Sequence, residues 1–128
     1  MKDKYVLDSS IWIDIERGKS STIALTQPLI DKNQVCLVDL IVAELLRGTK
    51  SLKDYQLLKK AFAAFSQLTT SWEKVAQLAF EVGRKGYTPP LTDLYIAQCV
   101  WENKKILITR DKDFAHIANC RAFAVEIL

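Results

Sequence analysis

The stretch that most constrains the fold is a short apolar run near the end of the chain, Ile106 to Ile108, which is followed by Thr109, Arg110 and Asp111. The apolar residues are continuous and mostly β-branched, which is typical of a strand buried on both faces of a parallel sheet. In open parallel sheets, ligands bind in the crevice beyond the carboxyl ends of the strands. We therefore expect Asp111, and Asp113 after it, to lie beside a ligand crevice.

Similar strand patterns recur along the chain and alternate with helical patterns. Strands are predicted at residues 5–7, 34–38, 68–70, 106–108 and 122–127. Helices are predicted at 11–17, 20–31 and 40–47, after Ser51 and Ser71, from Thr92 or Asp93, and as a short turn at 113–118. Pro28 is expected to interrupt the second of these helices. This alternation predicts an α/β fold, a parallel sheet with helices on both faces, in one domain covering residues 1–128.

The composition narrows the possible functions. At 128 residues and 49% hydrophobic, the chain can bury a full core, and it contains no apolar run long enough to span a membrane. The N-terminus lacks the apolar core of a signal peptide, and the three cysteines are odd in number and widely spaced, as in reduced cytoplasmic proteins. A single histidine, His116, and no paired cysteines argue against a zinc site or a histidine triad. The net charge of +3 is compatible with nucleic acid.

Four carboxylates stand among apolar neighbours, where burial is costly unless something compensates the charge. They are Asp8, Glu44, Asp93 and Asp111. Asp8 and Asp111 follow strands, and Asp93 opens the helix that leads into the strand at 106–108. Glu44 is about one and a half helical turns beyond the strand at 34–38. We expect other acids to face solvent, among them Asp14, Glu16, Asp54 and Glu102.

Placement at strand ends and at a helix start predicts that all four acids meet at one edge of the sheet. Their combined charge of roughly −4 would be unstable without counter-ions. Hard divalent cations with oxygen ligands, Mg²⁺ or Mn²⁺, would supply these. Two such ions can support in-line displacement at a phosphodiester without any histidine.

Each acid also has an ordinary structural interpretation. Asp8 could cap the following helix, Asp93 and Asp113 are good N-cap residues, and Asp111 could be a turn residue. Glu44 could pair with Arg47 three residues later. The tryptophans at 12, 72 and 101 are expected in the core, the paired lysines on solvated faces, and His116 on the surface or in packing.

At this point the sequence resembles the PIN-domain family, and specifically the toxin ribonucleases of VapBC-type toxin–antitoxin pairs. The similarity covers the whole chain, in order, through the stretches Leu7-Asp8-Ser9-Ser10-Ile11-Trp12-Ile13, Val42-Ala43-Glu44-Leu45-Leu46-Arg47-Gly48, Thr92-Asp93-Leu94-Tyr95-Ile96-Ala97 and Ile108-Thr109-Arg110-Asp111-Lys112-Asp113-Phe114.

The resemblance implies a three-layer α/β/α PIN-like domain with a central parallel sheet of about five strands. It implies that Asp8, Glu44, Asp93 and Asp111 bind Mg²⁺ or Mn²⁺, with Asp113 as a fifth acid. Two hydroxyls, those of Ser10 and Thr109, would orient the acids. The basic residues that would contact RNA phosphates are Arg47, Arg110 and Lys112.

The family also implies endonucleolytic cleavage of RNA in single strands or loops, a homodimer, and neutralisation by a VapB-type antitoxin. Two alternatives remain open. One is a PIN-like module that binds RNA or protein without cutting, since fold does not guarantee activity. The other is a phosphatase in which Asp8 is the nucleophile, although Ser10 stands where such enzymes need a second acid.

Overall fold

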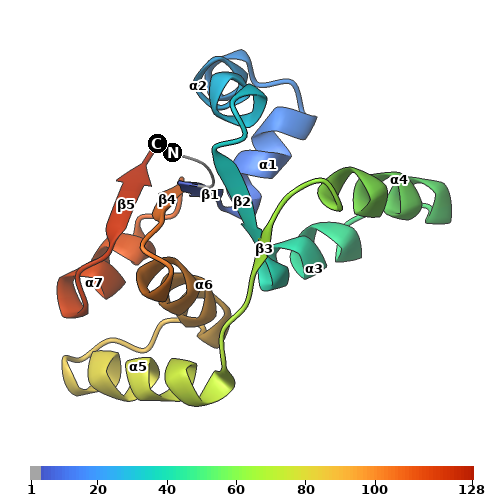
Figure 1. Ribbon diagram of the computed structural model, residues 1–128. Helices are drawn as coiled ribbons and strands as arrows, with labels where there is room; N and C mark the ends of the chain where they lie inside the picture. The colour runs from blue at the N-terminus through green and yellow to red at the C-terminus, as the bar shows by residue number, and fades with distance from the viewer. Residues whose placement is uncertain (1–3) are drawn as a thin grey trace.

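The sheet has five parallel strands in the order β3-β2-β1-β4-β5. The computed structural model (Figure 1) describes residues 4–128. The strands are β1 (Tyr5–Leu7), β2 (Val35–Val38), β3 (Gln67–Leu68), β4 (Ile106–Thr109) and β5 (Ala124–Ile127). This confirms the predicted parallel sheet, and each strand overlaps the stretch that the sequence indicated.

Helices cover both faces of this sheet, which makes the three-layer α/β/α fold. They are α1 (Ser9–Glu16), α2 (Ser20–Asp31), α3 (Asp39–Arg47), α4 (Leu52–Phe62), α5 (Trp72–Arg84), α6 (Leu91–Glu102) and α7 (Asp113–Cys120). In Figure 1, α1 and α2 lie apart from α5, α6 and α7, with the strands between the two groups, and α3 and α4 lie beside β2 and β3. No helix within residues 4–128 is both long enough and apolar enough to cross a membrane.

Neighbouring residues of β1 show how the strands divide the core. Val6 packs into the cluster formed with α5, α6 and α7, whereas Leu7 packs with Ile11 of α1 and with residues of α2. Successive side chains of a strand point to opposite faces of a sheet, so an apolar run serves both layers. The continuous apolar pattern at Ile106–Ile108 has the same cause, since Leu107 and Ile108 belong to different clusters.

The strand order reverses between β1 and β4. From β1 the chain builds outward to β2 and β3 on one side, and β4 and β5 then extend the sheet on the other side. Such a reversal separates the two loops that leave the neighbouring carboxyl ends, and it opens a crevice there. Asp8 and Arg110 directly follow β1 and β4 at this edge of the sheet.

Three helices begin earlier than predicted. Helix α3 begins at Asp39, one residue before the predicted start. Helix α1 begins at Ser9, two residues before the predicted start, because Asp8 is its N-cap. Helix α6 begins at Leu91, immediately after Pro90. Proline has a fixed φ that suits a helix entrance, so the helix starts before Thr92.

The structure corrects three further expectations. Pro28 does not interrupt α2, because it lies near the helix end and its own carbonyl still accepts from Lys32 N–H. Trp72 and Trp101 are 55% and 43% exposed, so they are not core residues; Trp12 does pack, edge-on, against two phenylalanines. Asp14 does not face solvent: it is buried, because Arg110, Lys19 and the Thr22 hydroxyl compensate its charge.

Candidate active site

Asp8 occupies the junction between β1 and α1, and both of its carboxylate oxygens are held. Oδ1 accepts from the backbone N–H of Ser9 at 2.9 Å, and Oδ2 accepts from the hydroxyl of Thr109 at 2.7 Å. The side chain is almost fully buried, with 6% of the residue exposed. Burial raises the pKa of Asp8, and these hydrogen bonds partly offset that rise.

The end of β4 is tied to the end of β1 through two hydroxyls. Thr109 donates to Asp8 and at the same time accepts from the backbone N–H of Asp111 at 3.0 Å. Ser10 accepts from the backbone N–H of Arg110 at 3.4 Å. The Asp111 carboxylate accepts from the N–H of Asp113 at 2.9 Å, at the entrance to α7. Residues far apart in sequence thus form one hydrogen-bonded corner.

Asp93 lies in the first turn of α6, and the charges of the other acids affect its pKa. Its pKa is raised to about 6, first by burial and then by the charges of Asp111, Asp8, Glu44 and Asp113, in that order. Burial alone raises a carboxyl pKa, and like charges nearby raise it further. The five acids therefore share one electrostatic environment at the crevice.

Glu44 reaches this environment from α3. The residue is exposed, yet partial shielding of its carboxylate from water and the charge of Asp8 raise its pKa. Helix α3 is fastened to α6 at its first residue, because the Tyr95 hydroxyl lies 2.8 and 3.0 Å from the two carboxylate oxygens of Asp39. The same hydroxyl accepts from the backbone N–H of Thr70 at 3.3 Å.

The donor chemistry fits a hard divalent cation. The acids and the hydroxyls of Ser10 and Thr109 offer carboxylate and hydroxyl oxygens, and burial, with the charges of neighbouring acids, raises the pKa of Asp8, Glu44 and Asp93. Within residues 4–128, no three of the acidic, cysteine or histidine side chains are close enough to bind one ion together. Mg²⁺ usually takes one or two protein carboxylates and keeps several waters, so this spacing remains compatible with it.

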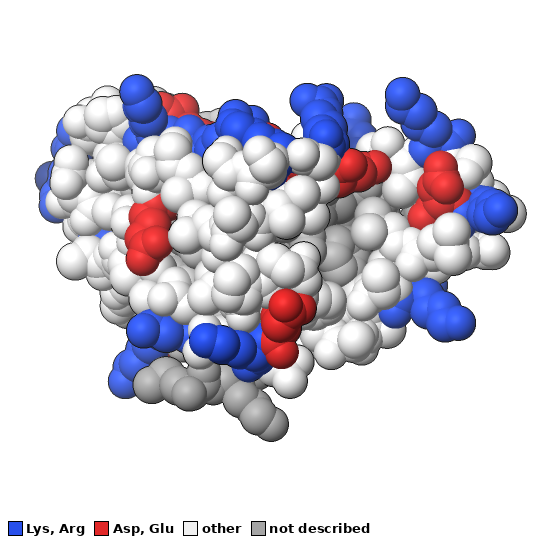
Figure 2. Space-filling view, turned by 90° about the horizontal axis from the view of Figure 1, so that it is seen from above, with Lys and Arg blue, Asp and Glu red and all other residues white. Residues whose placement is uncertain are grey.

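The basic residues predicted to contact RNA are all exposed. Arg47 and Lys112 are exposed, and Arg110 is exposed but forms an ion pair of 3.0 Å with Asp14. On the face seen in Figure 2, Lys and Arg side chains lie mostly along the edges and the middle is largely uncharged. The pairing of Arg110 with Asp14 gives this arginine a structural role that the sequence did not reveal.

Two pairs were missed by sequence reasoning, Asp39–Tyr95 and Asp14–Arg110. Asp39 directly follows β2, as Asp8 directly follows β1. The equivalence of these two positions was a usable signal. No pattern in the sequence distinguished Asp14 from a surface acid.

The PIN domain family matches residues 5–119. The chain belongs to the PIN-domain family. Solved structures agree with this PIN fold, and a chain of the VapBC2 complex from Rickettsia felis, bound to promoter DNA, aligns with a TM-score of 0.77. Its sequence is 20% identical, and the alignment covers 97% of this PIN domain and 98% of that chain.

Two further structures resemble this PIN domain. A chain of DNA-bound VapBC from Salmonella typhimurium has a TM-score of 0.76 at 18% identity and covers 99% of this chain and 98% of its own. A toxin–antitoxin complex from Klebsiella pneumoniae has a TM-score of 0.67 at 26% identity and covers 87% and 90%. No curated protein matches the chain by sequence. The structural likeness supports the family assignment over nearly the whole chain.

Proposed function

We propose that this PIN domain is a metal-dependent endoribonuclease and the toxin of a toxin–antitoxin pair. One observation carries the nuclease proposal: besides burial, the charges of acids from separate segments raise the pKa of Asp93, at the edge of the sheet where the strand order reverses. A purely structural set of surface acids would avoid such mutual repulsion, whereas a cation site requires it.

In this proposal Asp8, Asp93, Glu44 and Asp111 hold Mg²⁺ or Mn²⁺, with Asp113 as an additional acid. A divalent cation in such a site lowers the pKa of a water and neutralises the charge that develops on the leaving oxygen. The hydrogen bonds from Ser9 and Thr109 favour the ionised form of the Asp8 carboxylate and fix its orientation. Thr109 also fixes the backbone that leads to Asp111. Preorientation of this kind reduces the reorganisation needed at reaction.

The proposed substrate is RNA in a single strand or a loop, where unstacked nucleotides leave a phosphodiester accessible to the acids. Arg47 and Lys112 are exposed cations that could hold flanking phosphates, and Arg110 could do so while paired with Asp14. Contacts of this kind position RNA without reading its sequence.

The proposed partners are a VapB-type antitoxin and a second copy of this chain. The structures named above were determined as VapBC or toxin–antitoxin complexes, which supports an antitoxin for this chain. The test is co-expression with the product of a short adjacent reading frame, followed by purification and light scattering. A stable complex that lacks RNase activity supports the toxin role, and a chain that stays monomeric and active beside that product contradicts it.

The nuclease proposal is tested with a radiolabelled unstructured RNA, with and without Mg²⁺. We expect cleavage that EDTA abolishes and that Asp8→Asn reduces by at least about a hundredfold, since metal ligands are required for the chemistry. Asp31→Asn is the matched control, because it removes the same charge from an exposed position at the end of α2.

Two outcomes would reject the nuclease. Cleavage that persists in EDTA would exclude metal dependence. RNA that binds to the folded protein but stays intact with both Mg²⁺ and Mn²⁺ would identify the chain as a binding module. Trapping a phosphoaspartate at Asp8 would instead support the phosphatase alternative.

A further inference from the structure

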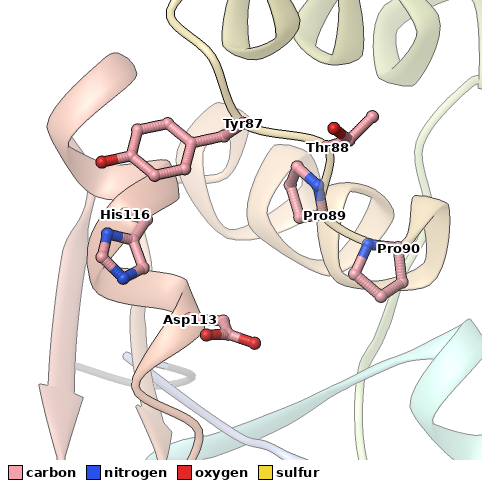
Figure 3. Close-up of a pocket in the computed structure, with 6 residues that line it drawn as sticks. All are labelled: Tyr87, Thr88, Pro89, Pro90, Asp113 and His116. Atoms are coloured by element: carbon pink, nitrogen blue, oxygen red, sulfur yellow. The ribbon is translucent and has the colours of Figure 1, made fainter.

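A small pocket lies between the loop that follows α5 and the first turn of α7. Figure 3 shows Tyr87 and His116 on one side, the prolines on the other, and Asp113 between them. The pocket measures about 240 Å³ and is lined by Tyr87, Thr88, Pro89, Pro90, Asp113 and His116. Tyr87 and His116 are stacked, with ring centroids 5.0 Å apart and planes 28° from parallel.

The size and walls of the pocket suit a flat, uncharged ring. Pockets for drug-sized ligands measure about 300–1,000 Å³, so this one accommodates a single ring system rather than a whole nucleotide. Its lining contains no lysine or arginine, and the Asp113 carboxylate would repel a phosphate. A nucleobase has an aromatic face for stacking and donor groups that a carboxylate can accept.

Two residues of the pocket, Asp113 and Pro90, connect it to the acids of the candidate active site. Asp113 lines the pocket and also contributes to the electrostatic environment of Asp93. Pro90 lines the pocket and is the N-cap of α6, the helix that carries Asp93 in its first turn. A base in the pocket would therefore lie close to a phosphodiester held at the acids.

The walls are also preorganised. Two consecutive prolines restrict the loop, and Pro90 is anchored because its carbonyl accepts from the N–H of Leu94 in α6. Tyr87 is fixed by its backbone N–H, which donates to the carbonyl of Val82 at 3.2 Å. A surface that is ordered before binding spends less of its interaction energy on ordering itself.

We propose that this pocket binds one unpaired base of the RNA, flanking the scissile phosphodiester, by stacking on the Tyr87–His116 pair. The proposal rests on the ribonuclease function proposed above and adds a residue-level specificity site to it. Single-stranded RNA is commonly recognised in this way, through bases that leave the stack and lie on aromatic side chains. Tyr87 and His116 are specificity residues here, since they contact the RNA but take no part in the displacement.

The experiment uses a short unstructured RNA whose cleavage position has been mapped, and a set of copies with one abasic residue at each flanking position. For the wild-type protein, we expect one position at which removal of the base raises KM about tenfold with little change in kcat, as loss of stacking should. In Tyr87→Ala, the intact RNA should show that same rise in KM, and the abasic residue should add nothing further.

Two controls separate stacking from general damage. Tyr87→Phe keeps the ring and should preserve the wild-type KM. Tyr55→Ala removes a tyrosine of matched exposure, 37% against 39%, from α4, and should leave the abasic pattern unchanged. His116→Ala should weaken the dependence on the same base, whereas His116→Phe should retain it.

Failure of this proposal is distinguishable from failure of the proposed function. If the wild-type protein cuts RNA but the abasic residue has the same effect in Tyr87→Ala, the pocket does not bind a base. If no RNA is cut, the ribonuclease proposal fails, and fluorescence anisotropy with the same RNAs still tests the pocket. If Tyr87→Ala leaves RNA cleavage and binding unchanged but weakens a co-purifying antitoxin, the pocket takes a protein side chain and the proposal is overturned.

Discussion

The hydroxyl of Thr109 donates a hydrogen bond of 2.7 Å to Oδ2 of Asp8, a residue 101 positions earlier in the chain. The Thr109 hydroxyl oxygen also accepts a hydrogen bond from the backbone N–H of Asp111. One side chain therefore joins β4 to the start of α1 and to the loop that leads to α7. It also lowers the pKa of Asp8, against the effect of burial.

Replacing Thr109 by valine removes the hydroxyl and keeps the shape of the side chain. We expect a loss of about 1–3 kcal/mol in unfolding free energy, because an oxygen of Asp8 loses its partner in a buried place. Apparent Mg²⁺ affinity should fall by about 10–100-fold, as it does when residues that orient metal ligands are changed. Urea unfolding and a titration of activity against Mg²⁺ measure the two effects.

Thr109→Ser is the control, since it keeps the hydroxyl and loses only a methyl group. It should restore most of the Mg²⁺ affinity. If valine and serine variants bind Mg²⁺ equally well, the hydroxyl has no role in orienting Asp8.

A second prediction concerns the ion pair between Asp14 and Arg110. The Asp14 side chain is 5% exposed and the Arg110 side chain 43%, so solvent screens one end of the pair. We expect Asp14→Asn to cost about 1–2 kcal/mol, below the 3–5 kcal/mol that follows loss of one partner in a fully buried pair. Urea unfolding of Asp14→Asn, Arg110→Gln and the double variant measures the coupling, and Glu16→Gln provides an exposed control.

The same variants test whether Arg110 also binds RNA. If its only role is to pair with Asp14, both single variants should change RNA cleavage to the same small extent. A KM that rises in Arg110→Gln but not in Asp14→Asn would indicate a direct phosphate contact. Purely additive unfolding energies would contradict the structural role.

The third prediction concerns Tyr95, which joins α6 to α3. Its hydroxyl contacts both carboxylate oxygens of Asp39 and accepts from Thr70 N–H. Tyr95→Phe removes this partner from the Thr70 N–H and from Asp39 Oδ2, whereas Asp39 Oδ1 still accepts from Leu40 N–H. We expect a cost of about 1–2 kcal/mol in thermal or urea unfolding. Tyr55→Phe is the control, because that tyrosine is more exposed. Equal stability of the two variants would show that the Asp39 contact contributes nothing.

Local patterns predicted the sheet because its strands are short, apolar and bounded by polar residues. Val35–Val38 and Ile106–Thr109 carry that signal in their own residues. Trp72 and Trp101 were wrongly predicted to be core residues. They lie near the ends of α5 and α6, where their side chains are exposed on the surface. Burial at a helix end depends on the neighbouring element, which the local sequence does not encode.

Some residues of the candidate site could likewise be predicted from the sequence, and others could not. Asp8 and Asp111 were recognisable because each follows an apolar strand, and the order of parallel strands then brings their elements together. Tyr87 and His116 carry no periodic signal, since one lies in a loop and the other on an exposed helical turn. Their stacking depends on how α7 packs beside that loop, which is a tertiary relationship.

The final prediction is a pH dependence that follows from Asp93. Its pKa is about 6 in the folded protein, against 3.8 for an unperturbed aspartate. Between those values the folded state retains a proton that the unfolded state has lost, so stability falls as pH rises from about 4 to about 6. The raised pKa values of Asp8 and Glu44 act in the same direction.

Asp93→Asn isolates this contribution. At pH 7 we expect the variant to be more stable than the wild type by about 1–2 kcal/mol, a value reduced to allow for solvent screening of a partly exposed group. Loss of the favourable interaction between Asp93 and the N-terminus of α6, about 0.3–1 kcal/mol, opposes this gain without cancelling it. Urea unfolding at pH 5 and pH 7 should show a weaker pH dependence in the variant.

At pH 7, Mg²⁺ should make the wild type more stable than Asp93→Asn, which reverses their order of stability without the ion. An ion that binds the folded state alone stabilises it in proportion to the logarithm of its concentration above Kd, so millimolar Mg²⁺ should raise the unfolding midpoint of the wild type. Asp93→Asn should respond little, because a ligand is missing. At pH 5 the wild type should respond less than at pH 7, since the proton on Asp93 competes with the cation. Equal Mg²⁺ responses in both proteins, or in the wild type at both pH values, would remove Asp93 from the metal site.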